Sequence, residues 1–403
     1  EKGARWCIVD KNSQYIQNIR QTSPSLGSKL IQVDDTVSAL HQIAKAIRDT
    51  LTIPVVCVSG CNGKTTTKNM LVAVFKEQYG DSAVLYTEGN NNNHIGVPLT
   101  LLSYKKEHVV AVIELGSNHP GEIETLCSIA QPTHGITTNI GAAHIEFFGS
   151  LQAIADEEGS LGRYIPQQGV YVLPKEDMYS EYIAQKTKAK VLYSDTPAVE
   201  CLDVYFSNAS NGKGIGNMLD IIGIRAPHIV ADALLVITLC YHMGIKPAVI
   251  LKGLSNIKQD KGRFEIKDVQ FFSTVVQRNI ACSVVDDTYN ANPDSVVAST
   301  KAVATLYPHR EKVLVLGILK ELGSYTHTGY VRILRSAVEF NFSSIILVGI
   351  EDSFDELKEE LEMINIHMCA SNKEAIEYIK HTINEGAVVL CKGSHGAKMW
   401  EVV

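Results

Sequence analysis

A glycine-rich turn between an apolar run and a helical stretch constrains the fold of this chain more than any other feature of its sequence. The turn, Ser59–Thr66, reads SGCNGKTT, and the apolar run Ile53–Val58 before it is typical of a buried strand. In Thr65–Gln78, which follows, apolar residues recur at the spacing of one helical face. Glycines let a backbone approach phosphates, and the amides at a helix N-terminus supply positive potential. The segment therefore predicts a phosphate-binding loop in an α/β domain.

The residue types inside this loop suit a nucleotide. Lys64 would reach the β- and γ-phosphates, and the hydroxyl of Thr65 would hold Mg²⁺. The predicted nucleotide contacts are the loop residues Gly60, Cys61, Asn62, Gly63, Lys64, Thr65 and Thr66. The spacing, G-x-x-G-K-T, is shorter than that of the common loop, G-x-x-x-x-G-K-T. An ordinary glycine-rich turn is the alternative. Cys61 could also be a reactive thiol, although the loop needs backbone amides at that position.

Strands that alternate with helices set the expected fold class. After the loop, His108–Leu115 and His134–Thr138 are strand candidates, and such alternation indicates a mostly parallel sheet covered on both faces. Beyond residue 308 the pattern recurs, with apolar runs at Lys312–Gly317, Ser344–Gly349 and Ala387–Cys391. That second series predicts a small doubly wound domain.

The length of 403 residues exceeds what one hydrophobic core usually organises. We expect an α/β protein of three parts. They are a truncated N-terminal α/β piece at residues 1–50, a central phosphate-loop domain with a mostly parallel sheet at 51–307, and a C-terminal Rossmann-like domain at 308–403. A glycine-rich turn at 211–216 and a helix at 355–363 are also expected.

Composition limits the partners of the chain. The formal net charge of −7 argues against general binding to nucleic acid or anionic membranes, and no apolar run could span a bilayer. The N-terminal residues lack the layout of a secretion signal. The nine cysteines are scattered without a C-x-x-C pair, as in proteins that keep reduced, buried thiols. We expect a cytoplasmic monomer that acts on small molecules, with no nucleic-acid partner and no membrane insertion.

Six ordered segments narrow the interpretation, because together they resemble the Mur ligase family and, within it, the MurF branch. They are Gly60–Thr66, Thr87–Pro98, Glu114–Ile123, Thr138–His144, Asp286–Ser295 and the pair Glu321–Gly323 with Lys392–Ser394. The resemblance runs from about Val37 to the C-terminus. It implies a ligase that uses ATP to phosphorylate a carboxylate, giving an acyl phosphate that an amine attacks. In the MurF branch the amine is D-alanyl-D-alanine and the carboxylate belongs to UDP-muramoyl-tripeptide.

The resemblance also implies roles for residues outside the loop. Glu114 would bind Mg²⁺ and His144 would bind a second metal ion, so that Lys64, Glu114 and His144 form the catalytic set. Further contacts to ATP are implied for Asn92, Asn93, Arg263, Asp287, Tyr289, Asn290 and Asn292. On position alone, Glu114 could be a solvated strand end, the asparagines a plain polar loop, and Arg263 a surface residue.

The chain also departs from the family pattern. Residues 1–50 resemble only the last part of the domain that grips UDP, which leaves UDP binding open. Glu158 stands where the family has a carbamylated lysine, and we expect its carboxylate to hold the second metal. The alternative is a solvated acidic helix. Ile318 replaces an Asp, and Ile229 and Asp232 replace two Asn.

The leading prediction is therefore a ligase of the MurF type that uses ATP and Mg²⁺. A related amide ligase with another acceptor, such as a folylpolyglutamate-type enzyme, is one alternative. A catalytically silent ATP-binding scaffold is another, supported by the altered Glu158 and Ile318 and opposed by the intact Lys64, Glu114 and His144.

Overall fold

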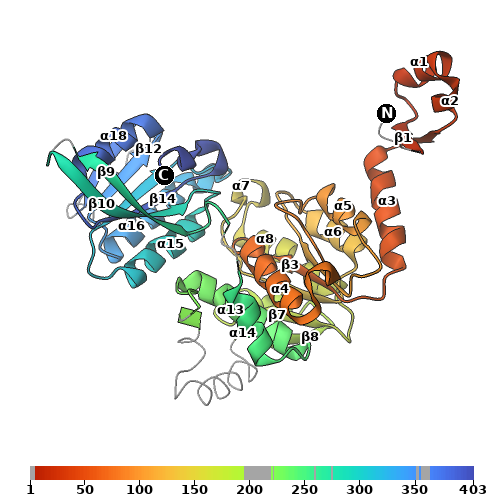
Figure 1. Cartoon of the computed structure of the whole chain (residues 1–403), viewed down its shortest axis with the longest axis horizontal. Helices are drawn as coiled ribbons and strands as arrows, with labels where there is room; N and C mark the ends of the chain where they lie inside the picture. Colours follow the sequence, from red (N-terminus) through yellow and green to blue (C-terminus); the bar gives the residue numbers. More distant parts are fainter. Residues whose placement is uncertain are drawn as a thin grey trace.

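The computed structural model of the chain describes residues 5–194, 219–220, 222–257, 260–273, 276–350, 354 and 364–403. The expected turn at 211–216 and the expected helix at 355–363 lie outside the described residues. Three sheets organise the described part, and Figure 1 shows them following one another along the chain. No helix in these ranges is long and apolar enough to cross a membrane.

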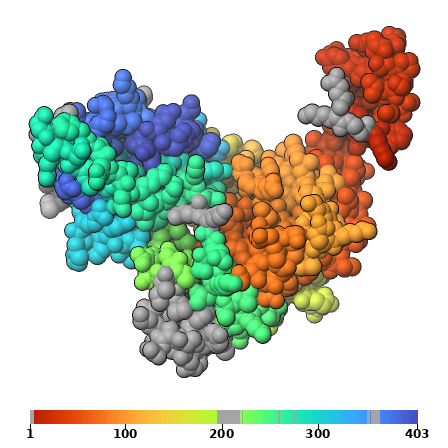
Figure 2. Space-filling view, in the orientation of Figure 1, coloured from red at the N-terminus to blue at the C-terminus, as the bar shows by residue number. Residues whose placement is uncertain are grey.

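The N-terminal piece is small and stands apart from the rest. Its two parallel strands are β1 (Cys7–Asp10) and β2 (Leu30–Val33). The helices α1 (Tyr15–Thr22) and α2 (Pro24–Gly27) lie between these strands in the chain. The long helix α3 (Thr36–Asp49) joins this piece to the central sheet. Figures 1 and 2 show the N-terminal piece protruding from the rest of the molecule. Its large aromatic side chains are mostly exposed, because a piece of this size encloses little core.

The central sheet is wholly parallel, with the strand order β4-β5-β3-β6-β7-β8. Its strands are β3 (Val55–Ser59), β4 (Val84–Tyr86), β5 (Val110–Glu114), β6 (His134–Thr137), β7 (Val170–Leu173) and β8 (Lys190–Tyr193). Every residue of β3 and β5 is buried, as expected for parallel strands covered on both faces.

Helices cover both faces of this sheet. On one face, α4 (Lys64–Tyr79), α13 (Pro227–His242) and α14 (Pro247–Ser255) share a core with Val56 and Val58 of β3. On the other face, α3, α5 (Gly96–Leu102) and α6 (Glu122–Ala130) pack with Val55 and Cys57. The alternation along β3 follows from the two-residue period of a strand. The remaining short elements are η1 (Asp81–Ala83), α7 (Ile145–Phe148), α8 (Leu151–Glu158), α9 (Leu161–Tyr164) and α10 (Ser180–Ala184).

The second sheet has the order β13-β12-β11-β14-β10-β9, in which only the β9–β10 pair is antiparallel. Its strands are β9 (Glu265–Ser273), β10 (Arg278–Asp287), β11 (Lys312–Gly317), β12 (Ser344–Val348), β13 (Asn365–Cys369) and β14 (Val388–Lys392). With it lie α15 (Pro293–Leu306), η2 (Gly323–Tyr325), α16 (Thr326–Glu339), α18 (Asn372–Thr382), η4 (His395–Ala397) and η5 (Met399–Glu401).

The second sheet begins earlier in the chain than the expected boundary at 307/308. Because β10 pairs with β14, the stretch from β9 to α15 belongs to this sheet rather than to the central one. In the edge strand β9, half-buried residues alternate with exposed ones. The strand therefore lacks the continuous apolar run that made β11 recognisable in the sequence. The fold class itself, α/β with a mostly parallel central sheet and a second α/β sheet, is confirmed.

Candidate active site

One large cavity lies between the two six-stranded sheets and has a volume of about 1040 Å³. Its walls come from the carboxyl ends of β3, β5 and β6, from α13, and from the segment after β10. Ligands of open parallel sheets bind at this edge. The predicted site residues that line it are Cys61, Asn62, Gly63, Lys64, Thr65, Thr66, Asn92, Asn93, Glu114, His144, Arg263, Asp287, Tyr289, Asn290 and Asn292.

The phosphate loop connects β3 to α4 and needs glycine at two positions. Gly60 has a φ of 118°, and a Cβ there would lie 2.2 Å from the hydroxyl of Thr138. Gly63 has a φ of 79°, and its Cβ would lie 2.5 Å from the carboxylate oxygens of Asp232. Each glycine therefore permits both a left-handed backbone and a close approach.

Two other loop residues have clear positions. Lys64 is the first residue of α4, and its Nζ folds back onto the carbonyl oxygens of Gly60 and Cys61. The Cys61 sulfur accepts a hydrogen bond from the Gly141 amide at 3.1 Å. Burial raises the pKa of the Cys61 thiol to about 12, and the negative charge of Glu158 adds to the rise. Cys61 is thus a protonated, structural thiol rather than a reactive one.

Glu114 ends β5 with an almost fully buried carboxylate. Oε1 accepts hydrogen bonds from the Thr65 hydroxyl at 3.0 Å and from Asn92 Nδ2 at 2.8 Å. Oε2 is buried with no hydrogen-bond partner among the described residues, and Lys68 Nζ lies 3.7 Å from it. Burying a carboxylate oxygen without a hydrogen bond costs free energy, which a bound cation would offset. The oxygen donors of Glu114 and Thr65 beside the loop fit a hard cation such as Mg²⁺.

His144 follows β6 and lies at the border of the two sheets. It has a φ of 54° and precedes α7. Its Nδ1 lies 2.5 Å from a carboxylate oxygen of Glu321, which precedes η2 of the second sheet. A second contact, from the Glu146 amide to the Glu321 carbonyl at 3.2 Å, holds the same pair of segments. The ring is therefore oriented by a carboxylate from the other sheet.

Glu158 lies outside the cavity and has partners other than the expected metal. One carboxylate oxygen accepts the Gly60 amide at 2.7 Å, and the other accepts the Ser117 hydroxyl at 3.1 Å. Glu158 is 4% exposed and is not a solvated acidic residue. Gly60 does not line the cavity either, although its amide anchors the loop. In this geometry both carboxylate oxygens of Glu158 support the phosphate loop and Ser117, and the expected metal role stays a prediction.

A buried ion pair fixes the segment after β10. Lys392 Nζ lies 2.6 Å from Asp287 Oδ2, and Lys392 is only 3% exposed. The same oxygen accepts the Ser299 hydroxyl at 2.6 Å, and Oδ1 accepts the Phe264 amide at 3.1 Å. Burial by itself would raise the pKa of Asp287, but the charge and hydrogen bond of Lys392, with that of Ser299, lower it.

Tyr289 and Asn290 of this segment form one wall of the cavity together with Gly262 and Arg263. The guanidinium of Arg263 lies 4.1 Å from the centre of the Tyr289 ring, and the Tyr289 amide donates to the Gly262 carbonyl at 2.9 Å. The side chain of Asn290 accepts the His395 amide at 3.2 Å. An aromatic ring with a stacked cation and nearby amides can hold a planar base.

Asparagines on both sides complete the cavity. Asn292 caps α15, and its Nδ2 donates to the side-chain oxygen of Asn62 at 2.9 Å across the two sheets. Asn93 accepts the amides of Ile95 and Gly96 at the start of α5, so its side chain is used locally.

Sequence reasoning missed several residues of the site. Asp232 is 5% exposed beside Gly63, and burial raises its pKa well above the ordinary value. A lone acid in the apolar Ala231–His242 stretch was the available signal. Asn139 fixes Asn62 through its side-chain oxygen at 3.1 Å. Asp294 accepts the Ala142 amide at 2.6 Å across the sheets, which no local pattern reveals.

Comparison with known proteins agrees with this geometry. The family model described as "Mur ligase middle domain" matches residues 58–209, and "Mur ligase, glutamate ligase domain" matches residues 262–395. The chain is similar to the UDP-N-acetylmuramoyl-tripeptide--D-alanyl-D-alanine ligase of Bacillus subtilis, at 31% identity over 94% of this chain and 82% of that protein.

Two solved structures share the architecture. One is MurF from Acinetobacter baumannii, with a TM-score of 0.74 and 27% identity over 93% of this chain and 81% of that chain. The other is MurF ligase from Thermotoga maritima in complex with ADP, with a TM-score of 0.73 and 20% identity over 99% of this chain and 87% of that chain. The second likeness concerns the fold alone.

Proposed function

The chain belongs to the Mur ligase family, and from this premise we propose that it is an ATP-dependent, ADP-forming ligase that joins D-alanyl-D-alanine to UDP-N-acetylmuramoyl-tripeptide. The product is a peptidoglycan precursor. One observation carries the proposal: the phosphate loop, Glu114, His144 and the segment Asp287–Asn292 line a single cavity. Its volume of about 1040 Å³ gives room for a nucleotide and part of a second substrate.

The reaction has two balanced steps. In the first, a carboxylate oxygen of the tripeptide attacks the γ-phosphorus of ATP, the bond to the β-phosphate oxygen breaks, and ADP leaves. In the second, the amine of the dipeptide attacks the acyl carbon, the bond to the phosphate oxygen breaks, and inorganic phosphate leaves while the amine loses a proton. Both steps depend mainly on position and on neutralisation of phosphate charge.

The phosphate loop would supply that neutralisation. Lys64 Nζ bends over the loop toward the carbonyls of Gly60 and Cys61. A phosphate bound in the loop would therefore lie close to the positive charge of Lys64. The N-terminus of α4 adds the partial charge of its free amides. Glu158 keeps the Gly60 amide and hence the loop in place.

Mg²⁺ is the metal that this donor set fits, and when bound it would neutralise phosphate charge during transfer. Thr65 and Glu114 would hold one ion, because the second carboxylate oxygen of Glu114 is buried without a hydrogen-bond partner among the described residues and only Lys68 Nζ, 3.7 Å away, is paired with it there. His144 would serve a second ion through its remaining ring nitrogen, since Glu321 occupies Nδ1.

The adenosine would lie against the segment after β10. Tyr289 and Arg263 form one wall, Asp287 and Asn290 hold its shape, and Asn292 joins it to the phosphate loop. Asn92 would face the phosphates because it contacts Glu114. A site closed between two sheets excludes water from the acyl phosphate. We further propose a cytoplasmic monomer.

Phosphate release tests this function. The chain should be incubated with ATP and Mg²⁺, with UDP-muramoyl-tripeptide and D-alanyl-D-alanine present singly and together. Release that requires both substrates supports the proposal. Tight ATP binding without substrate-dependent release would instead identify an ATP-binding scaffold, and release with another acid–amine pair would assign another substrate.

Two lysines on α4 provide a matched comparison. Lys64→Ala should lower the rate of release by about a hundredfold or more, because a phosphate charge clamp is lost. Lys76→Ala, about three turns further along the helix, removes contacts to the ring and hydroxyl of Tyr86 and should leave the rate close to the parent value. Equal rates for the two variants would overturn the role of the loop.

A further inference from the structure

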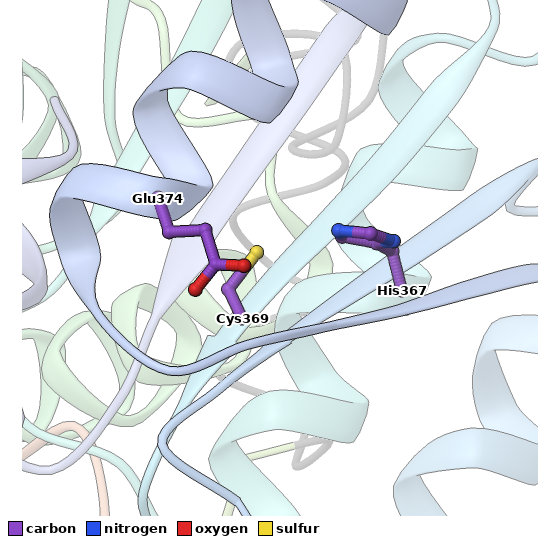
Figure 3. A group of neighbouring side chains, drawn as sticks. All are labelled: His367, Cys369 and Glu374. Carbon is purple, nitrogen blue, oxygen red and sulfur yellow. The ribbon is translucent and has the colours of Figure 1, made fainter.

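Away from the active-site cavity, three side chains with metal-binding atoms meet at the edge of the second sheet. His367 and Cys369 lie on β13, and Glu374 lies in the first turn of α18. One ligand atom of each lies within 4.8 Å of those of the other two. Figure 3 shows Glu374 reaching from the helix toward the Cys369 sulfur, with the His367 ring on the opposite side of that sulfur. The proposed ligase reaction uses none of these groups.

The backbone brings these three residues together. Residues two apart on a strand project from the same face, so His367 and Cys369 point to one side of β13. The start of α18 is fixed over that side, because the Ser371 hydroxyl accepts the Glu374 amide at 3.3 Å. One carboxylate oxygen of Glu374 accepts the Ala370 amide at 2.7 Å, which leaves the other oxygen for a ligand.

The His367 ring is held in a defined orientation. It stacks on Tyr378 with ring centroids 3.6 Å apart and an angle of 3° between the planes. Tyr378 lies one helical turn after Glu374, so both reach the same side of α18. The Tyr378 hydroxyl in turn accepts Asn365 Nδ2 at 3.2 Å. Supporting contacts of this kind orient the imidazole ligands of metal sites.

The donor set decides which ion suits the cluster. Imidazole nitrogen, thiolate sulfur and carboxylate oxygen together fit Zn²⁺, whereas Mg²⁺ and Ca²⁺ prefer oxygen alone. Tetrahedral bonds of about 2.0–2.3 Å place ligand atoms roughly 3.5 Å apart. The exposed Glu374 side chain can supply the small contraction that this requires, while Cys369 is buried at 3% exposure.

We propose that His367, Cys369 and Glu374 form a zinc site, completed by water, that ties the edge strand β13 to the first turn of α18. The thiolate is the form of cysteine that binds zinc, so binding would release a proton. Because the ion binds the folded arrangement, its occupancy stabilises the second sheet by mass action. The site lies outside the ligase cavity and does not depend on the proposed ligase function.

The test is a calorimetric titration of the chelator-treated full chain with ZnCl₂ in a buffer that holds excess Mg²⁺. One Zn²⁺ per chain should bind. C369A, H367Q and E374Q should each weaken binding by at least about tenfold, because each removes one of three protein ligands. On the same helix, E377Q and H381Q are matched controls for charge and imidazole and should bind like the parent chain.

Two further measurements keep the proposal falsifiable if a variant is unstable. Co²⁺ in place of Zn²⁺ should give a sulfur-to-metal charge-transfer band in the parent chain that disappears in C369A. Zn²⁺ should raise the unfolding temperature of the parent and leave that of C369A unchanged. Absence of stoichiometric Zn²⁺ binding by the parent, or a thiolate band that survives C369A, would overturn the site.

Discussion

The buried pair Lys392–Asp287 offers the sharpest test of how the second sheet holds the segment after β10, which we propose binds the adenosine. Lys392→Met keeps the length of the side chain and removes its charge, leaving the Asp287 carboxylate, which is 14% exposed, without its buried cation. Loss of one partner of a buried pair costs about 3–5 kcal/mol. For a domain of roughly 150 residues this corresponds to a fall in unfolding temperature of roughly 6–20 °C.

The neighbouring strand position provides the control. Lys267 and Asp286 form an ion pair with a similar separation, 2.7 Å against 2.6 Å. Both carboxylates are largely buried, but Lys267 is 37% exposed whereas Lys392 is 3% exposed. Solvent reaches the Lys267 ammonium and screens this pair, so it contributes less than a pair whose cation is buried. Lys267→Met should therefore change the unfolding temperature much less than Lys392→Met. Differential scanning calorimetry measures both, and hydrogen exchange of the Val388–Lys392 amides reports the local loss.

The pH dependence follows from the sign of the pKa shift. In the parent chain the pKa of Asp287 is lowered from its ordinary value of 3.8, so the stabilisation is present above that value and is lost as the pH falls through the folded pKa. In Lys392→Met the effect of burial, which is the largest cause, is opposed only by the Ser299 hydrogen bond and the weaker influence of His228, so the Asp287 pKa should rise above 3.8. The variant then loses stability as the pH rises through that window. The difference from the parent should be large at neutral pH and small near pH 4.

A double variant separates the loss of the ion pair from the cost of the unpaired buried charge. Asp287→Asn removes the unpaired charge, so Lys392→Met/Asp287→Asn should recover most of the stability that Lys392→Met loses. Equal losses for Lys392→Met and Lys267→Met, or a double variant less stable than Lys392→Met at neutral pH, would refute the role assigned to burial.

Three further predictions concern the central sheet. Glu158→Ala leaves the Gly60 amide buried without its acceptor, at a cost of about 1–3 kcal/mol. The variant should bind ATP more weakly, while the Mg²⁺ dependence of its turnover stays unchanged. A shifted Mg²⁺ requirement would favour a metal role for Glu158 instead. Asp232→Asn should raise the unfolding temperature at alkaline pH. In the parent chain the pKa of Asp232 is raised, so the folded protein loses stability as the pH rises. Parallel pH profiles of the unfolding temperature in variant and parent would contradict this. Glu321→Ala frees the His144 ring and should lower kcat/KM for phosphate release about tenfold or more, with ATP affinity measured by calorimetry nearly constant.

Local patterns predicted those parts of the protein that depend on nearby residues. The phosphate loop could be read from sequence because its strand, its glycines and its helix are contiguous and each has a distinct signal. The strand β11 was predicted with its observed ends, since all six of its residues are buried and apolar or small apart from Lys312. Glu114 was predicted at a strand end and lies there, in the cavity.

Features that depend on distant pairing could not be read in this way. The edge strand β9 is recognisable only through its antiparallel pairing with β10. The metal role of Glu158 was expected from its place in the family pattern, whereas its hydrogen bonds to an amide 98 positions away and to the Ser117 hydroxyl could not be predicted. Lys392 likewise meets Asp287 from 105 positions away. In each case the chemistry of a side chain was visible and its partner was not.

The position of His144 shows how the two sheets act together. Ile145, the next residue, is buried in a core cluster that also contains Leu316 and Leu322 of the second sheet. Apolar packing therefore docks α7 against that sheet, and the contact between Glu321 and His144 then sets the orientation of the ring. Movement of the second sheet would displace the ring and the nucleotide wall at once, because both are attached to it. The arrangement thus links the orientation of the His144 ring to the position of the second sheet, as the proposed ligase reaction would need if the cavity closes around its substrates.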